Sequence, residues 1–177
     1  MRKDSMQSDD IHLDFVRARQ LAYETSGLHL NNIRREVESA EYGACEFRLG
    51  GKLCKFRVGK VTPKKMGFFI TIWKRDGVGP IMPYDLTDPV DLFVFSACTS
   101  QHFGQFVFPK AVLHEKGILS REGIGGKRAL RVYPPWVLAP NRQAKKTQGW
   151  QVQYFFEIPT TIPVESARIR QLFFSKE

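Results

Sequence analysis

The sequence has few cysteines, and none is placed to bind zinc or to build a disulfide framework. The three among its 177 residues are Cys45, Cys54 and Cys98, an odd number at wide spacing without a CxxC pair. Structural zinc sites need closely spaced Cys and His ligands, so we expect no zinc. Each cysteine lies in an apolar, strand-like segment, where a buried thiol is the usual state.

Long apolar runs are also missing. No segment approaches the about 20 apolar residues that a membrane-spanning helix needs, and residues 1–5 lack the apolar core of a signal peptide. We therefore expect a cytoplasmic protein that does not enter a membrane. With 42% hydrophobic and 25% charged residues, the composition is typical of a globular protein and argues against a largely disordered chain.

Acidic side chains are missing from two long segments of a basic chain. There are 27 Lys and Arg against 18 Asp and Glu, a formal charge of +9, and residues 1–41 hold only six of the basic but eight of the acidic residues. Residues 55–75 and 127–150, the two acid-free windows, contain Lys, Arg and aromatic residues but no acid. Such a pattern favours a polyanionic partner, DNA or RNA; the alternative is that these cations only face solvent.

The spacing of apolar residues predicts an α/β chain, in the α+β sense, with a central mixed β-sheet flanked by helices. Residues 1–8 are polar and are expected to form a disordered tail, and residues 9–177 a single domain. An apolar stripe predicts one helix from Asp9 or Asp10 to Gly27 and another over 31–40. Pro109 and Gly117 predict a helix over 110–116, and a last helix is expected from residue 163. The predicted strands are residues 44–49, 53–61, 68–74, 91–98, 105–108 and 127–133.

Two connections and one ambiguous segment complete this prediction. Gly50 and Gly51 separate two strands and predict a hairpin turn. Residues 76–89 are rich in Gly and Pro and predict a loop. Residues 141–158 fit both a helix face and an alternating strand, and their length favours a helix.

The sequence carries none of the common catalytic or phosphate-loop motifs. A GxSxG nucleophile elbow is absent, and so are the Walker and dinucleotide-binding glycine loops. Residues 123–127, Gly-Ile-Gly-Gly-Lys, lack the Walker spacing and precede a strand-like run, so they predict a flexible loop.

The best-organised basic stretch is residues 56–75, two strands joined by a short Thr-Pro-Lys-Lys-Met-Gly connection. Lys and Arg side chains supported by hydroxyl groups read a phosphate backbone, and a tryptophan ring stacks on unpaired bases. Trp73 fits such a role or a place in the core equally well. The residues we predict to contact nucleic acid, from both acid-free windows, are Arg57, Lys60, Thr62, Lys64, Lys65, Trp73, Lys74, Arg75, Arg128, Arg131 and Lys145.

Several ordered motifs connect this chain to a known family. They are Glu41-Tyr42-Gly43-Ala44, Phe56-Arg57 with Lys60, Thr62-Pro63 with Lys65, Trp73-Lys74-Arg75, Gly104 with Phe106-Val107-Phe108-Pro109-Lys110, Lys127-Arg128 with Arg131-Val132-Tyr133-Pro134-Pro135-Trp136, and Thr147-Gln148 with Trp150-Gln151. With these motifs, residues 38–158 resemble the MepB-like family of small bacterial proteins. The resemblance implies a restriction-endonuclease-like fold, similar to that of PD-(D/E)xK nucleases, with nucleic-acid binding as the activity.

A nuclease of the PD-(D/E)xK kind needs a carboxylate on one strand and a second acid, two positions before a lysine, on the next. The carboxylates hold Mg²⁺, which activates water. Here Asp91 begins a buried strand and Lys110 follows the next one, so Asp91 and Lys110 are the candidate catalytic residues and Asp91 is the candidate metal ligand. Phe108 stands in the place of the second acid, and one carboxylate holds Mg²⁺ weakly. Other acids near the first strands are Glu36, Glu38, Glu41 and Glu46.

The leading hypothesis is therefore a cofactor-free nucleic-acid-binding protein with a nuclease-like fold and a degenerate or absent catalytic centre. Binding is expected to be electrostatic and weakly sequence-specific, with aromatic residues favouring single strands. The alternatives are an active Mg²⁺-dependent nuclease and a stress- or drug-response module that binds a small molecule or a protein. The position of the two acid-free windows discriminates between nucleic-acid binding and the last of these alternatives. Windows on opposite sides of the fold would not form a continuous track for a polyanion.

Overall fold

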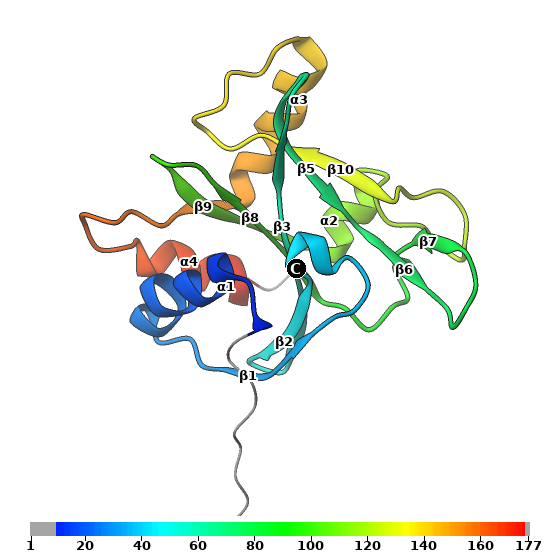
Figure 1. Ribbon diagram of the computed structural model, residues 1–177, viewed down its shortest axis with the longest axis horizontal. Helices are drawn as coiled ribbons and strands as arrows, with labels where there is room; N and C mark the ends of the chain where they lie inside the picture. Colours follow the sequence, from blue (N-terminus) through cyan, green and yellow to red (C-terminus); the bar gives the residue numbers. More distant parts are fainter. Residues whose placement is uncertain (1–9, 176–177) are drawn as a thin grey trace, which may run out of the picture.

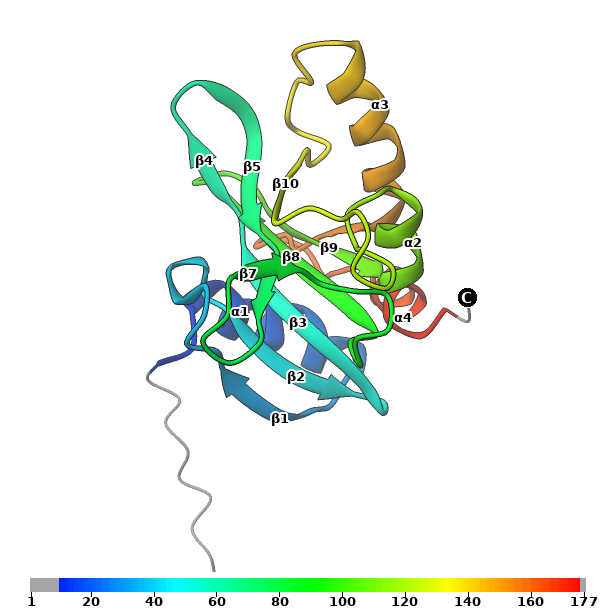
Figure 2. The same cartoon turned by 90° about the vertical axis from the view of Figure 1, so that its right-hand side faces the viewer.

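A mixed six-stranded β-sheet lies at the centre of the computed structural model, which describes residues 10–175 (Figures 1 and 2). The strand order is β1-β2-β3-β8-β9-β11, and all neighbours are antiparallel except β3 and β8. The strands are β1 (Leu30–Arg35), β2 (Cys45–Leu49), β3 (Lys52–Val58), β8 (Leu92–Cys98), β9 (Phe103–Pro109) and β11 (Phe155–Glu157). Together with the helices, this sheet confirms the predicted α+β class.

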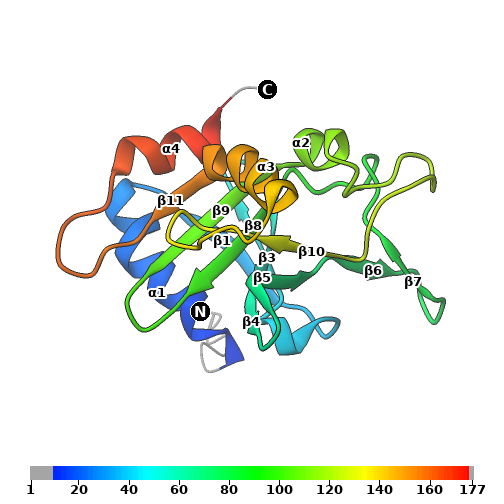
Figure 3. The same cartoon turned by 90° about the horizontal axis from the view of Figure 1, so that it is seen from above.

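Helices cover one face of this sheet (Figure 3). They are α1 (Leu13–Ala18), the π-helix η2 (Arg19–Tyr23), the 3-10 turn η3 (Glu24–Ser26) and α4 (Ser166–Phe174). The apolar stripe predicted for the first helix is real, since Phe15, Ala18 and Ala22 are all buried against the sheet. Gly27 ends this segment with a φ of 75°, as predicted.

A second, smaller sheet and two helices cover the opposite face. The sheet has the order β10-β5-β4 and consists of β10 (Ala129–Val132), β5 (Lys65–Thr71) and β4 (Lys60–Thr62). The helices are α2 (Lys110–Glu115) and α3 (Arg142–Gln151). Phe68, Ile70 and Val132 point from the small sheet into a core shared with Phe93, Phe95 and Phe108 of the central sheet. The remaining elements are the β6–β7 pair (Trp73–Arg75 and Ile81–Pro83) and the 3-10 turns η4 (Ala40–Tyr42) and η5 (Val152–Tyr154).

The chain passes from the central sheet to the small sheet at Gly59. Its N–H donates to the Ser96 carbonyl at 2.8 Å, and a Cβ at this position would lie 2.8 Å from the Phe68 Cβ. Only glycine allows the two sheets to approach so closely here. The single strand predicted over residues 53–61 is therefore divided, with β3 in one sheet and β4 in the other.

The helix predicted over residues 31–40 is wrong. Residues 30–35 form the edge strand β1, whose pairing with β2 shifts register between Asn31 and Arg34. Asn32 takes a φ of 51°, which turns Leu30 and Ile33 toward the same core. A bulged strand thus places apolar residues three apart on one face, and this spacing imitates a helix.

Residues 141–158 contain both of the alternatives that their pattern allowed. Residues 142–151 form α3, capped by Asn141, whose side chain accepts the Ala144 N–H at 2.8 Å. Residues 155–157 form β11, paired with β9, so the helix prediction fails there. Within the predicted loop over 76–89, residues 81–83 form β7. Gly50 and Gly51, with φ of 55° and 80°, form the predicted hairpin turn. The predicted tail over residues 1–8 lies outside the described residues.

Gly104→Ala should destabilise the protein by roughly 2 kcal/mol or more, because overpacking a filled core strains it. The new Cβ would lie 2.2 Å from the Phe155 ring and 2.7 Å from the Phe156 carbonyl. Urea unfolding followed by circular dichroism measures the difference. The matched control is Gly149→Ala in α3, where nothing lies within 4 Å of the added Cβ and a gain of about 1 kcal/mol is expected. Equal stabilities of the two variants would contradict the close packing of β9 on β11.

Candidate nucleic-acid interface

The two acid-free windows lie side by side in the small sheet. Strand β10, from the second window, pairs with β5, from the first, so that Leu130 faces Ile70 and Arg131 faces Phe69. The Arg131 guanidinium also reaches the carbonyls of Lys65, Met66 and Gly67 at 3.2 to 3.5 Å. The windows are thus not on opposite sides of the fold, and the geometric objection to a continuous polyanion track does not apply.

A row of two cations with an aromatic ring between them crosses the open face of the small sheet. Phe69 of β5 faces Lys60 on one neighbouring strand and Arg131 on the other, and directly opposed residues share a face. We call these three residues the basic–aromatic row. Lys60 is exposed, Phe69 and Arg131 are half-buried, and the Arg131 Cζ lies 5.8 Å from the centre of the Phe69 ring.

Tyr42 extends the row from the turn η4. Its ring centre lies 6.2 Å from that of Phe69, and the Lys60 Nζ lies 4.4 Å above it. Partial burial, with the charge of Glu41, raises the pKa of the Tyr42 phenol, so the ring stays neutral near pH 7. Two aromatic rings and two cations therefore lie together on this face.

The β4–β5 hairpin projects from the body of the molecule at the same end as α3 (Figure 2). Its tip carries the predicted contacts Lys64 and Lys65, both exposed, and the half-buried Thr62, whose hydroxyl lies 3.4 Å from the Lys65 carbonyl. Arg128, next to β10, and Lys145, on α3, are exposed as well. Among residues 10–175, no carboxylate pairs with Lys60, Lys64, Lys65, Arg128, Arg131 or Lys145.

Arg57 does not belong to this surface. It is only 2% exposed, and its guanidinium binds the Glu36 carboxylate at 2.6 Å and the Tyr84 hydroxyl at 3.4 Å. Lys55, two residues earlier on β3, binds both Glu36 at 2.5 Å and Glu46 at 2.9 Å. Lys55 and Arg57 therefore form an ion-pair cluster with Glu36 and Glu46 under the second layer.

Within this cluster the charges compensate the cost of burial. Burial alone acts to lower the pKa of Lys55, but Tyr84, Glu36 and Glu46 together raise it. Burial likewise acts to raise the pKa of Glu46, but the hydrogen bond from Lys55 and the charges of Lys55, Arg34 and Arg48 together outweigh it, so this pKa is lowered. Both side chains are thus held in their charged forms, as a paired structural cluster requires.

The predicted contacts Trp73, Lys74 and Arg75 also lie away from the hairpin. They form β6, which pairs with β7 on another side of the molecule (Figure 1). Lys74 binds Asp88 at 2.5 Å, and Arg75 binds Glu38 at 3.0 Å. Acids distant in sequence therefore pair with the cations of this part of the window.

Asp91 and Lys110 come together at the ends of β8 and β9, on the rim of a hollow of about 380 Å³. Asp91 is the only acid among its lining residues within the described chain, and its Oδ2 already accepts the Leu53 N–H at 2.8 Å. Two acids flank a lysine elsewhere, at Lys55, but all four oxygens of Glu36 and Glu46 face a nitrogen of Lys55, Arg57 or Arg34. Neither arrangement offers the free carboxylate pair that a Mg²⁺ site of this kind needs.

Two of the three cysteines are buried, as the sequence predicted, and the third is not fully so. Cys45 and Cys54 are buried and Cys98 is half-buried, and all three are free thiols. Burial, assisted by the charge of Asp91, raises the pKa of Cys54 to about 12. In the part of the chain that the structure describes, no three His, Cys, Asp or Glu side chains gather as a metal site, and no helix is long and apolar enough to cross a membrane.

The sequence motifs did not single out Phe69 or Tyr42 as binding residues. Phe69 lies in a run, Gly67 to Ile72, in which Thr71 is the one residue with a polar side chain, so the run suggests a core strand. Alternation along β5 is the signal that was available: Phe68 and Ile70 are buried, whereas Phe69 between them faces the other side.

Arg57→Met should destabilise the fold by roughly 3–5 kcal/mol, because it removes the buried cation of the pair and leaves the half-buried Glu36 carboxylate without one of its two cations. Urea unfolding measures this loss, and Arg57→Lys should restore part of it. The control Arg48→Met changes an exposed arginine of β2 and should shift stability by no more than about 0.5 kcal/mol. An Arg57→Met protein of unchanged stability would show that the ion-pair cluster does not support the fold.

Two comparisons with known proteins identify the family of this chain. The MepB-like family matches residues 36–157. The chain is also similar to a crystal structure of MepB, with 30% sequence identity and a TM-score of 0.72 over 86% of this chain and 99% of that one. The sequence matches no curated protein. Since the family match spans well over half of the 177 residues, the chain belongs to the MepB-like family.

Proposed function

We propose that this protein binds single-stranded nucleic acid across the basic–aromatic row, on a nuclease-like fold whose catalytic centre is degenerate or absent. The observation that carries the proposal is the line Lys60–Phe69–Arg131, in which an aromatic ring lies between two cations that no described carboxylate neutralises. Proteins that bind single strands combine these two features, a positively charged groove for the backbone and aromatic rings on which bases stack.

The cations of the row and of the hairpin tip contact phosphates, and the aromatic ring of the row contacts a base. Phosphates lie against Lys60, Arg131 and the tip residues Lys64 and Lys65, and a base stacks on Phe69. Phosphate contacts carry no sequence information, and every base offers a face for stacking. Binding is therefore weakly sequence-specific and depends on salt.

Two features make binding without catalysis the better proposal. The acids near the basic surface, Glu36 and Glu46, are engaged by cations, and the hollow at Asp91 holds a single carboxylate. The buried free thiols fit a reducing compartment, and we place the binding function in the cytoplasm.

The Lys64→Gln/Lys65→Gln double variant should reduce the salt dependence of binding. For single strands, the slope of log K against log[salt] changes by about 0.7 for each phosphate neutralised, so the variant should lose about 1.4 if each lysine neutralises one. Fluorescence anisotropy with labelled single-stranded RNA, single-stranded DNA and duplex over a salt series measures these slopes.

The control for this experiment is Arg48→Gln/Lys52→Gln, which removes two charges at the β2–β3 turn, the opposite end of the molecule from the hairpin (Figure 2). It should leave the slope unchanged. Absence of binding to any polynucleotide at low salt would overturn the proposal. So would cleavage of these substrates in Mg²⁺ or Mn²⁺ that disappears in Asp91→Ala, since it would show an active nuclease.

Phe69→Ala should weaken single-strand binding by about 1–3 kcal/mol, which is the contribution of one stacked base, and should do so for all base compositions. Phe69→Tyr keeps the ring and should bind within about twofold of the unchanged protein. The same anisotropy assay at fixed low salt measures both. If Phe69→Ala and Phe69→Tyr bind equally well, the row acts through its cations alone.

A further inference from the structure

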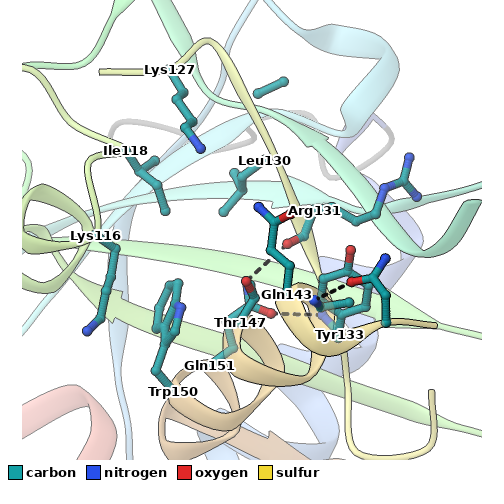
Figure 4. Close-up of a pocket in the computed structure, with 13 residues that line it drawn as sticks. Lys116, Ile118, Lys127, Leu130, Arg131, Tyr133, Gln143, Thr147, Trp150 and Gln151 are labelled. Carbon is teal, nitrogen blue, oxygen red and sulfur yellow. Dashed lines mark hydrogen bonds between the residues drawn. The ribbon is translucent and has the colours of Figure 1, made fainter. Parts of the chain in front are cut away.

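A cavity of about 340 Å³ lies between the edge strand β10 and helix α3 (Figure 4). It lies beyond β10 from the basic–aromatic row, because β10 pairs with β5 on its other edge. Its rim is completed by Lys116 and Ile118 after α2 and by Lys127 before β10. Cavities of this size are typical of small-molecule sites.

The wall between β10 and α3 is held in place by a buried glutamine. Gln151 is 1% exposed; its side chain accepts the Tyr133 N–H at 2.9 Å and donates to the Arg131 carbonyl at 3.0 Å. Since the N–H and C=O of one strand residue point to the same edge, the Arg131 N–H faces this side of β10 too. The cavity is therefore preformed, with a backbone donor along one wall.

The chemistry of the lining favours an anion attached to a flat ring. Lys116, Lys127 and Arg131 all line the cavity, but Figure 4 shows the Arg131 guanidinium directed away from it. Gln143 and Thr147 contribute neutral hydrogen-bonding groups, and no acid of the described residues lines the cavity. Lys116 also pairs with its neighbour Glu115 at 2.9 Å, so Lys127, which pairs with no described carboxylate, is the principal cation. Figure 4 shows its ammonium pointing toward Ile118 and Leu130, on the side of the cavity opposite the Trp150 ring.

Trp150 supplies an aromatic wall. Its ring packs on Phe108 at 5.3 Å between ring centres, tilted by 51°, and remains half-buried. The Lys116 Nζ lies 5.7 Å from the centre of this ring, so a base that stacks on Trp150 takes the place of this flexible side chain. Amide and hydroxyl groups from α3 lie along the same helix face, where they can pair with the polar edge of that base.

We propose that this cavity binds a nucleotide that carries a terminal phosphate monoester, with the phosphate at Lys127 and the base against Trp150. A monoester carries about −1.5 to −2 charges near pH 7, more than a backbone phosphodiester, so a cationic pocket selects it. The nucleotide is either free or the end of a strand that continues across the basic–aromatic row. Only the second source rests on the proposed function.

The test compares adenosine monophosphate with otherwise identical single-stranded oligonucleotides bearing a 5′-phosphate, a 3′-phosphate or neither. Calorimetry measures the free nucleotide and anisotropy the strands. A strand with the preferred terminal phosphate should bind about tenfold more tightly than the unphosphorylated strand, the gain expected of one charge-assisted contact. Lys127→Gln should abolish that difference and leave binding of the unphosphorylated strand within about twofold. Lys146→Gln, an exposed α3 lysine outside the lining, should keep the difference.

The outcomes separate this inference from the proposed function. Adenosine monophosphate binding that Lys127→Gln removes, without any preference among strands, supports the cavity as a site for the free nucleotide. Salt-dependent strand binding without a terminal-phosphate preference, combined with no binding of adenosine monophosphate at millimolar concentration, overturns the inference but not the proposed function. Nucleotide binding without any polynucleotide binding overturns the proposed function but not the inference.

Discussion

The close approach of two sheets at Gly59 is the constraint on which the rest of the structure depends. Because no side chain separates the Gly59 backbone from Phe68 and Ser96, the chain leaves the central sheet and continues into a second sheet without a loop. The second sheet then covers the phenylalanine-rich face of β8 and β9. The projecting hairpin, the basic–aromatic row and the edge of β10 all follow from this layer.

The same constraint divides the basic residues into two groups. Before Gly59, Lys55 and Arg57 point into the space between the layers, where a charge must be paired. After Gly59, Lys60 faces solvent. The acids that pair with the buried group come from Glu36 and Glu46, both outside the acid-free windows. An acid-free stretch of sequence is thus not an acid-free surface. Lys74 and Arg75 at the end of the window are paired as well, so only Lys60, Lys64 and Lys65 of the first window have no paired carboxylate among the described residues.

Elements whose pattern depends on local chemistry could be predicted from the sequence. The buried run Leu92–Cys98, the Gly50–Gly51 turn and the helix end at Gly27 are each specified by a few adjacent residues. The prediction failed over 31–40 because a bulge at Asn32 gives an edge strand the spacing of a helix, and only pairing with β2 reveals it. It failed at Phe155–Glu157 because three residues are too few to show a period, while their pairing with β9 comes from contact with a distant strand.

The candidate site, like the fold, was predictable from the sequence only in part. The sequence by itself determined that the positive excess lies after residue 41, that two windows lack acids, and that lysines surround the Thr62–Lys65 turn, since these are properties of composition. Only the tertiary structure decided which of those cations are free, that Phe69 lies between Lys60 and Arg131, and that β10 and α3 enclose a cavity. The physical reason is that charge pairing and cross-strand neighbours join residues tens of positions apart, and a linear pattern carries no record of which pairs meet.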